Sequence, residues 1–558
     1  MNNKLRFDIA ERPITYAGLY EEFVFDDDRL IEFNHRHRDA LANYDLTLDA
    51  CTIITMSRNI NKKSNLGALR NRKLRQSVIL AAGLSAIAVG LNGRGSLNKI
   101  PKDKQTKDLI NQLKRVNDRN AAQVMSEVLQ STTEKLPVGE EALIESTITE
   151  GARPKPGKEP GGNPTIAVGA VFGKEDHQAQ YGLTMPTNVS LLSMGSDVVE
   201  GTTKSVMGIH SSMTALFVTE SGVKRHLPDI YVQRWASGAW FGDFNPREVD
   251  VLEAANIIAK SYGLNNPKKL SAFFLDRNRH YPAMDRLNKA GISTPYDQDG
   301  DLLPLFLCGL DGIVFPDGRN LNSMIGEIGG SAEWAIGVLP LVWRGGQAIG
   351  MLTSQSSLTN KNLTAEEKWK ERFHFTEEEF IMIQDARFER KPYFTISDIV
   401  ENPFAGGISA FGAITDNCFI PFIKGVEGDF ENNRVIVNVL VINSLGMVEC
   451  WRLVFKANQG LNHSISLMTS PKERLRGKTG KELEKTIAKM LADPHERQRF
   501  RIFFNNEYYP AIIPVRDKMV LLHKAVHGLI KRRALMEYNQ GIIDATEKLA
   551  HEWFINSD

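Results

Sequence analysis

The chain has 558 residues, enough for two to four domains or for one large α/β unit with additions. Its 68 basic and 67 acidic residues nearly cancel, which excludes a global field that would attract a nucleic acid or an acidic membrane surface. Four widely spaced cysteines without a CxxC pair exclude a secreted disulfide framework and favour a reducing cytoplasm.

The first elements in chain order are two helices. The sequence begins without the apolar core of a signal peptide, and its most apolar run, residues 78–91, is too short to span a bilayer. That run predicts a buried helix ending at Gly93 and Gly95, and the basic stretch before it reads as a solvated approach to the helix. From Asp108 to about Leu129, apolar residues recur on one stripe and predict a second helix.

After the Pro, Gly and Lys-rich segment 151–164, which predicts a mobile loop, lid or linker, the pattern changes. Short β-branched runs, such as 165–172, 214–221, 271–276, 312–315 and 434–455, alternate with helical segments and predict a layered α/β fold. The last hundred residues become helical again. Those helices are expected to cover a core or an oligomer interface.

The stretch "SDVVEGTT" gathers carboxylates at the expected end of a strand. Asp197 and Glu200 lie three residues apart, Gly201 lets the backbone turn, and Thr202 or Thr203 offers a hydroxyl. Oxygen ligands of this kind suit Mg²⁺ or Mn²⁺, which bridge carboxylates to the phosphate oxygens of a substrate. Spacing alone favours a capped turn before a helix over a metal site.

Several segments together resemble the class II (GlpX-type) fructose-1,6-bisphosphatases. "DVVEGTTKSVMG" followed by "LPDIYVQRW" is similar to that family's Asp-Pro-Ile-Glu/Asp-Gly-Thr and Pro-Asp-Met-Tyr segments. In the family's order come "DRNRH" (276–280), "QDGD" (298–301), "GEIGGSAEWAIG" (326–337) and "FGAITDNCFIPFIKGV" (411–426), which resemble its phosphate-binding, sugar-binding, metal-binding and Thr-Asp-Gly-Asp segments. The resemblance runs from about residue 75 to 456.

The resemblance implies a layered α-β-α-β-α sugar-phosphatase fold of the inositol monophosphatase/fructose-bisphosphatase superfamily. It would leave residues 1–74 as an N-terminal extension and 457–558 as an added helical C-terminal region. It also implies three groups of site residues. The metal ligands would be Asp103, Glu145, Asp197, Glu200 and Glu333. The catalytic residues would be Thr202, Glu150 and Lys99. The substrate-binding residues would be Gly201, Thr202, Tyr231, Arg277, Arg279, His280, Asp299, Gly300 and Asp301.

The first half of this site departs from the family pattern. Lys99 and Asp103 keep the family spacing only if two residues are inserted. In "IESTITEGARP", threonines 147 and 149 stand where the family has carboxylates between Glu145 and Glu150. Because a threonine cannot act as a general base at neutral pH, activation of water would fall to the metal or to Glu150.

The implied reaction is metal-dependent hydrolysis of a phosphomonoester of fructose 1,6-bisphosphate or a related sugar phosphate, with Mg²⁺ or Mn²⁺ as cofactor. A cytoplasmic homo-oligomer, dimer or tetramer, is expected, with neither nucleic acid nor membrane as partner. Two alternatives stay open. One is a catalytically impaired protein of the same fold that serves in binding or assembly, and the other is a phosphatase acting on inositol or other polyol phosphates.

Overall fold

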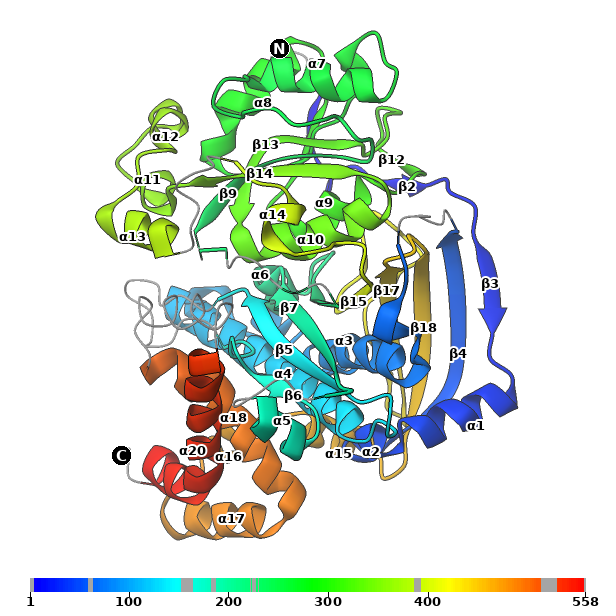
Figure 1. Ribbon diagram of the computed structural model, residues 1–558, viewed down its shortest axis with the longest axis vertical. Helices are drawn as coiled ribbons and strands as arrows, with labels where there is room; N and C mark the ends of the chain where they lie inside the picture. Colours follow the sequence, from blue (N-terminus) through cyan, green and yellow to red (C-terminus); the bar gives the residue numbers. More distant parts are fainter. Residues whose placement is uncertain are drawn as a thin grey trace.

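Five layers build the molecule in the computed structural model, which describes residues 5–58, 64–151, 164–181, 187–220, 222, 227–228, 230–385, 393–512 and 529–555. Helices cover one face of a ten-stranded sheet, a second helical layer lies on its other face, and a small sheet and a last pair of helices follow (Figure 1). This order confirms the predicted α-β-α-β-α arrangement with an added C-terminal helical region.

The ten-stranded sheet is mixed, and nearly all of its neighbours are antiparallel. β5 and β7 run parallel, so their carboxyl ends lie at the same edge. The order across the sheet is β3-β4-β18-β17-β15-β8-β7-β5-β6, with β16 beside β17. The bounds are β3 Glu21–Val24, β4 Leu46–Ser57, β5 Ala142–Thr149, β6 Val171–Phe172, β7 Ser190–Glu200, β8 Met213–Thr219, β15 Gly407–Ala413, β16 Glu427–Asp429, β17 Arg434–Asn443 and β18 Val448–Ala457.

Two long helices, α3 (Arg72–Asn92) and α4 (Lys107–Thr133), pack on the outer face of this sheet. Both begin with a side-chain cap, since Asn71 accepts a hydrogen bond from the amide of Leu74 and Thr106 from that of Leu109. α3 is buried almost all round, as its composition predicts. The segment 72–99 is long and apolar enough to cross a membrane, but 89% of its most apolar window is buried, which is typical of a core helix.

The inner face of the large sheet packs on α9 (Leu302–Leu307) and α10 (Ser331–Trp343). Beyond them lies an antiparallel sheet of order β13-β9-β14, and α7 and α8 cover its far face. Its neighbours are a parallel sheet of order β1-β11-β10 and the pair β12-β2. The bounds are β1 Arg6–Asp8, β2 Thr15–Tyr16, β9 Tyr231–Ser237, α7 Val251–Ser261, β10 Phe274–Leu275, α8 Tyr281–Lys289, β11 Thr294–Asp297, β12 Ile313–Val314, β13 Ser323–Gly330 and β14 Gln347–Thr353.

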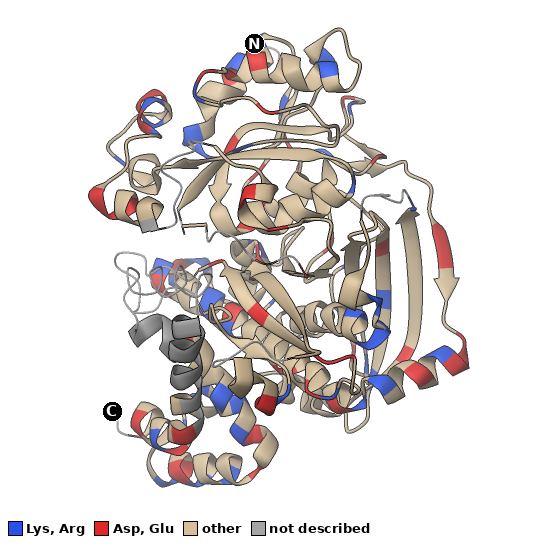
Figure 2. Ribbon diagram, in the orientation of Figure 1, with Lys and Arg blue, Asp and Glu red and all other residues tan. Residues whose placement is uncertain are grey.

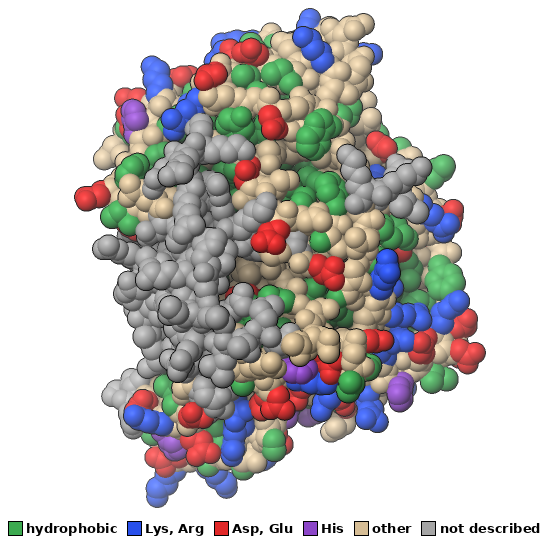
Figure 3. Space-filling model, in the orientation of Figure 1, with side chains coloured by type: hydrophobic (Ala, Val, Ile, Leu, Met, Phe, Trp, Pro, Cys, Tyr) green, Lys and Arg blue, Asp and Glu red, His purple; other side chains and the backbone are tan. Residues whose placement is uncertain are grey.

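The smaller helices lie at the edges of these layers. They are α1 Asp27–Arg36, α2 Arg38–Ala42, α5 Glu175–Tyr181, α6 Thr202–Met207, α11 Gln355–Thr359, α12 Ala365–Glu371, α13 Glu377–Asp385 and α14 Ile396–Ile399, with 3-10 turns η1 Gly67–Arg70, η2 Ser96–Lys99, η3 Lys102–Lys104, η4 Pro267–Lys269 and η5 Asn278–His280. In Figure 2 charges of both signs follow α1 and the C-terminal helices, whereas the strands carry few. Figure 3 shows both signs mixed over the described part of one face, so no field of one sign forms there.

The C-terminal region forms a helical unit with its own apolar cluster, and its helix α18 packs against α4. The helices are α15 Leu461–Leu467, α16 Pro471–Leu475, α17 Gly480–Ala492, α18 Pro494–Ile512 and α20 Leu529–Phe554. At the other end of the chain, residues 1–74 contribute β1 to β4 to three of the sheets.

The strand expected over residues 165–172 is wrong except at β6, because Ala170 donates a hydrogen bond to the carbonyl of Ala167 and closes a turn in which Gly169 has φ +86°. Most of the expected loop at 151–164 and part of the helical C-terminal region lie outside the described residues.

Candidate active site

A pocket of about 210 Å³ opens where the carboxyl ends of β5 and β7 meet the small sheet and the start of α10. It has many polar groups and draws on seven separate segments of the chain. The lining residues are Glu150, Glu200, Ile230, Tyr231, Leu275, Arg277, Arg279, Asp299, Gly300, Asp301, Gly329, Gly330, Glu333 and Gln355. Nine of them are residues that the family resemblance singles out.

A β-bulge brings the two acidic residues of β7 together. Three residues apart on a regular strand, Asp197 and Glu200 would point to opposite faces of the sheet. The pairing of β7 with β8 shifts between them, with Asp197 opposite Ala215 and Glu200 opposite Met213, so the extra residue turns both side chains to one side. A hydrogen bond joins the two carboxyl groups, and both residues are about 95% buried.

Glycines make room for two further carboxylates. A Cβ on Gly330 would lie 2.0 Å from Oε2 of Glu333, which stands in the first turn of α10. A Cβ on Gly329 would lie 1.7 Å from Oδ2 of Asp301. Any other residue at either position would fill the space that the carboxylates occupy.

The crowded acids raise one another's pKa. Burial, and then the charge of Glu200, raises the pKa of Asp197 well above its usual value. Burial and the charge of Asp301 raise the pKa of Glu200 to about 8. Burial, Asp301 and Glu150 raise that of Glu333. A divalent cation among these oxygens would favour the ionised forms, so this donor set fits Mg²⁺ or Mn²⁺.

The turn after β7 carries a hydroxyl two residues beyond Glu200. Gly201 adopts a left-handed conformation with φ +68°, which favours glycine, and its amide donates to Oε2 of Glu200. Thr202 then opens α6, and its hydroxyl donates to the carbonyl of Val199 at 2.9 Å. The oxygen of Thr202 therefore keeps its acceptor capacity.

Two arginines form the basic wall of the pocket. Arg279 donates from Nε and Nη2 to the carbonyl of Ile328, and its guanidinium lies 4.6 Å from the ring centre of Tyr231, so it is held rigidly. Arg277 is about one third exposed and lies 3.6 Å from Asp299. The two guanidinium groups are suited to bind a phosphate.

A cation that sequence reasoning missed lies behind the acids. Arg234, on β9, is fully buried and forms an ion pair of 3.0 Å with Asp301. Its Nε also lies 3.0 Å from Glu327, without the geometry of a hydrogen bond. Burial raises the pKa of Glu327 to about 7, against the opposing charge of Arg234. In the sequence a single arginine in a strand resembles any solvated polar residue, so no local signal marked it.

The structure corrects the prediction that His280 faces the substrate. Its ring is fully buried, Nδ1 lies 2.7 Å from the carbonyl of Leu275, and Nε2 accepts from the amide of Ile328. Burial lowers the pKa of His280 well below 6.5, so the ring is neutral. It holds the strand that carries Ile328 and does not line the pocket.

Three expected residues of the first half are not brought to this pocket. Lys99 and Asp103 are exposed on the turns between α3 and α4. Glu145 lies opposite Ser193 in the middle of β5 and accepts a hydrogen bond from Tyr181. Glu145 lies five positions before Glu150. Since a strand advances about 3.3 Å per residue, Glu145 is held well away from the strand end where Glu150 lies.

The two threonines in place of family carboxylates have structural partners. Thr147 donates to the carbonyl of Met194, and the hydroxyls of Thr149 and Thr165 lie 2.6 Å apart. Glu150, directly after β5, lines the pocket, and its amide donates to the carbonyl of Ser196. Of the predicted first half, Glu150 is the residue that the structure places with Glu200 and Glu333.

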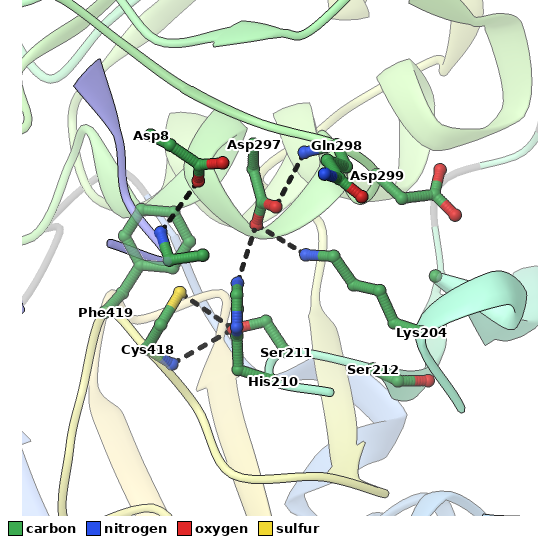
Figure 4. A network of polar contacts seen from close by, with 12 residues as sticks. Asp8, Lys204, His210, Ser211, Ser212, Asp297, Gln298, Asp299, Cys418 and Phe419 are labelled. Atoms are coloured by element: carbon green, nitrogen blue, oxygen red, sulfur yellow. Dashed lines mark hydrogen bonds and ion pairs between the residues drawn. The ribbon is translucent and has the colours of Figure 1, made fainter. Parts of the chain in front are cut away.

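A second polar network lies behind the turn at 297–301. Ligand atoms of His210, Asp297 and Cys418 lie within 4.8 Å of one another, a spacing that could hold a metal ion. However, the ammonium group of Lys204 already binds Asp297 at 2.5 Å (Figure 4). Because that cation would repel a metal ion, we interpret these residues as a closed ion-pair network.

Comparison with known proteins agrees with the geometry. Residues 185–448 match the model of the family described as bacterial fructose-1,6-bisphosphatase, glpX-encoded. A protein of a Synechococcus species, named D-fructose 1,6-bisphosphatase class 2/sedoheptulose 1,7-bisphosphatase, is 27% identical over 166 residues, 29% of this chain and 44% of its own length. A protein of the same name from Crocosphaera subtropica is 24% identical over 211 residues, 37% of this chain and 57% of its own.

The chain thus spans about half the length of these relatives. The family match includes Asp197, Glu200 and Glu333, and it begins after Glu150. The part of the site that the structure assembles most completely is also the part that resembles known proteins.

Proposed function

We propose that this chain, whose residues 185–448 belong to the GlpX-type fructose-1,6-bisphosphatase family, hydrolyses a phosphomonoester of a sugar bisphosphate. One observation carries the proposal: carboxylates from β7 and α10 line the same pocket as two arginines. Such a pocket combines oxygen ligands for a cation with donors for a phosphate.

The family resemblance implies a divalent metal, and the acids of the pocket suit one. Asp197, Glu200 and Glu333 would hold Mg²⁺ or Mn²⁺, with Glu150 at the pocket wall. When bound, the cation would polarise the phosphoryl oxygens and lower the pKa of a water molecule.

The chain's own groups would then orient the substrate. Arg277 and Arg279 would bind a phosphate, while Asp299 and Asp301 would accept hydrogen bonds from sugar hydroxyls. Thr202 could accept a hydrogen bond from the attacking water, and Glu150 could take its proton. We propose fructose 1,6-bisphosphate as the first substrate to test, with the seven-carbon bisphosphate as its close rival.

The test is phosphate release from sugar mono- and bisphosphates and inositol phosphates, with Mg²⁺ and with Mn²⁺. We expect metal-dependent release that Asp197→Ala lowers by about 100-fold or more, because a ligand to the cation is lost. Asp285→Ala is the matched control, since Asp285 is 61% exposed and forms a 3.6 Å surface pair with Arg6. Equal rates for Asp197→Ala and wild type would contradict this site.

A second candidate function has its own support. With Lys99 and Asp103 exposed and Thr147 and Thr149 in structural hydrogen bonds, the first half of the site holds fewer carboxylates than the family pattern. A protein that binds Mn²⁺ and sugar phosphate without releasing phosphate would fit this second function, binding or assembly. Release from an inositol phosphate but not from sugar phosphates would instead favour the polyol phosphatase.

We also propose a cytoplasmic homo-oligomer. A reducing compartment is supported by the four cysteines, all of which are free thiols. Light scattering on the purified chain would measure the oligomeric state.

A further inference from the structure

Three aspartates of one turn are each paired with a cation from a different part of the fold. The turn runs from Asp297, at the end of β11, through Asp299 to Asp301. Lys204 on α6 pairs with Asp297, Arg277 before η5 pairs with Asp299, and Arg234 on β9 pairs with Asp301.

The pairs differ in burial. Lys204 and Asp297 are 1% and 3% exposed, and Arg234 and Asp301 are 0% and 5% exposed. Arg277 and Asp299 are 38% and 31% exposed and lie 3.6 Å apart. Buried ion pairs therefore fix both ends of the turn, with Asp301 at the pocket wall, while Asp299 is the most exposed of the three.

Asp297 accepts three hydrogen bonds. It accepts from Nζ of Lys204 at 2.5 Å, from the amide of Gln298 at 2.7 Å and from Nε2 of His210 at 3.2 Å (Figure 4). Ser211, next to His210, is in turn tied to Cys418 by two hydrogen bonds of 3.0 Å.

Lys204 approaches the pocket from behind and does not enter it. A Cβ placed on Gly300 would lie 3.7 Å from Nζ of Lys204 and 3.6 Å from Oε1 of Glu200. Gly300 lines the pocket and has φ +85°, so a bare backbone separates the ammonium group from the substrate space. Because Lys204 is 1% exposed, it could act on a substrate only through the turn.

We propose that Lys204 is a positioning residue, which ties the helix after the metal-binding turn to the turn that recognises the sugar. The pair with Asp297 joins α6, which begins directly after Glu200 and Gly201, to the strand end that presents Asp299. Substrate recognition and the metal-binding acids are thereby held at a fixed separation. This inference rests on the proposed function, because it assigns a task within that site.

The test compares Lys204→Met, Asp297→Asn and the double variant with wild type. Methionine keeps the length of the side chain and removes its charge. We expect Lys204→Met to raise KM for the sugar bisphosphate about 10-fold, with kcat within about 3-fold, as for partners that orient a binding group. The double variant, which leaves no unpaired buried charge, should recover melting temperature but not KM.

Arg119→Met is the matched control, because Arg119 also forms buried ion pairs, with Glu473 and Glu507 of the C-terminal region. We expect it to lower the melting temperature and leave KM unchanged. If Lys204→Met behaves in the same way, the role of Lys204 is structural and the inference is wrong.

Calorimetry separates this inference from the proposed function. If wild type releases no phosphate, the proposed reaction fails, and affinity for fructose 1,6-bisphosphate in the presence of Mn²⁺ replaces KM as the readout. A loss of affinity of about 10-fold in Lys204→Met would still support the positioning role. Equal affinity of the two proteins, or no binding by either, would overturn it.

Discussion

His37 shows how burial acts on a single titratable side chain. It is 2% exposed, and its Nε2 lies 3.2 Å from the amide oxygen of Gln76. Burial lowers its pKa to about 3, and the hydrogen bond to Gln76 opposes the shift only in part. Between about pH 3 and pH 6.5, the ring is therefore neutral in the folded protein and protonated in the unfolded chain.

The lowered pKa predicts a loss of stability in acid. An unfolded histidine titrates near pH 6.5, so the stabilisation is full above that pH and is lost as the pH falls towards 3. Between pH 7 and pH 5 we expect His37 to account for about 2 kcal/mol of the fall in unfolding free energy. Urea unfolding of His37→Asn should show a correspondingly shallower pH dependence. The same slope as in the exposed control His463→Asn would contradict this assignment.

At the residue scale, the sequence predicted acids that stand in a recognisable order but not the cations that balance them. Asp197, Glu200 and Glu333 follow from the segments that carry them. Arg234 and Lys204 become significant only through partners far along the chain, so no local pattern predicts their burial. Glu145 was predicted as a metal ligand but lies in the middle of β5, because the order of segments in a family cannot distinguish the middle of a strand from its end.

Among the elements, α3 owes its place to close packing. A Cβ on Gly90 would lie 2.5 Å from Cβ of Val426, and one on Gly83 would lie 3.1 Å from Cγ2 of Val439. The glycines thus let the helix backbone approach the segments around β17. The sequence predicted this helix from its composition, and the structure adds the reason for its glycines.

Gly90→Ala should therefore destabilise the protein by about 1–3 kcal/mol, because the added methyl group must displace Val426. In α20, Gly541 has open space around it, and Gly541→Ala should be neutral or stabilise by up to about 1 kcal/mol. Thermal unfolding of both variants measures the difference. A Gly90→Ala protein as stable as Gly541→Ala would show that α3 can shift without cost.

The other helices and strands differ in how well their hydrophobic pattern in the sequence predicted them. The long runs at α4 and at the β17–β18 hairpin were predicted correctly, since each carries many periods of its repeat. The run at 165–172 has the composition of a strand but bends at Gly169, and only two residues pair with β5. Whether a short apolar run forms a strand is decided by its tertiary contacts.

At the scale of the whole molecule, buried ion pairs attach the C-terminal helices. Arg119 on α4 reaches Glu473 and Glu507 at 2.7 Å each, and Arg499 on α18 reaches Glu127 at 2.8 Å. Asn506 accepts from the amide of Ala167, close to the Thr149–Thr165 contact beside Glu150. The C-terminal region thus also contacts the segment that precedes β6.

Arg119→Met should lower the free energy of unfolding by about 3–5 kcal/mol, because Glu507 loses its buried cation and Glu473 keeps its pair with Arg476, whose side chain is 61% exposed. Arg286→Met removes a pair with Asp250 whose side chains are about half exposed, and should cost less than about 1 kcal/mol. Denaturant titration of both variants tests this. Equal small effects would mean that the C-terminal region is held by its apolar contacts alone.

The pairing of β4 with β18 also constrains the order of events during synthesis. The hydroxyl of Thr47 and the side chain of Asn458 meet across 411 positions of sequence. At about 5–20 residues per second, β4 leaves the ribosome tens of seconds before β18, its second neighbour, exists. Until then β4 has the short strand β3 beside it but not the rest of the sheet, and a nascent chain of this protein should depend on holdase chaperones until translation has passed β18.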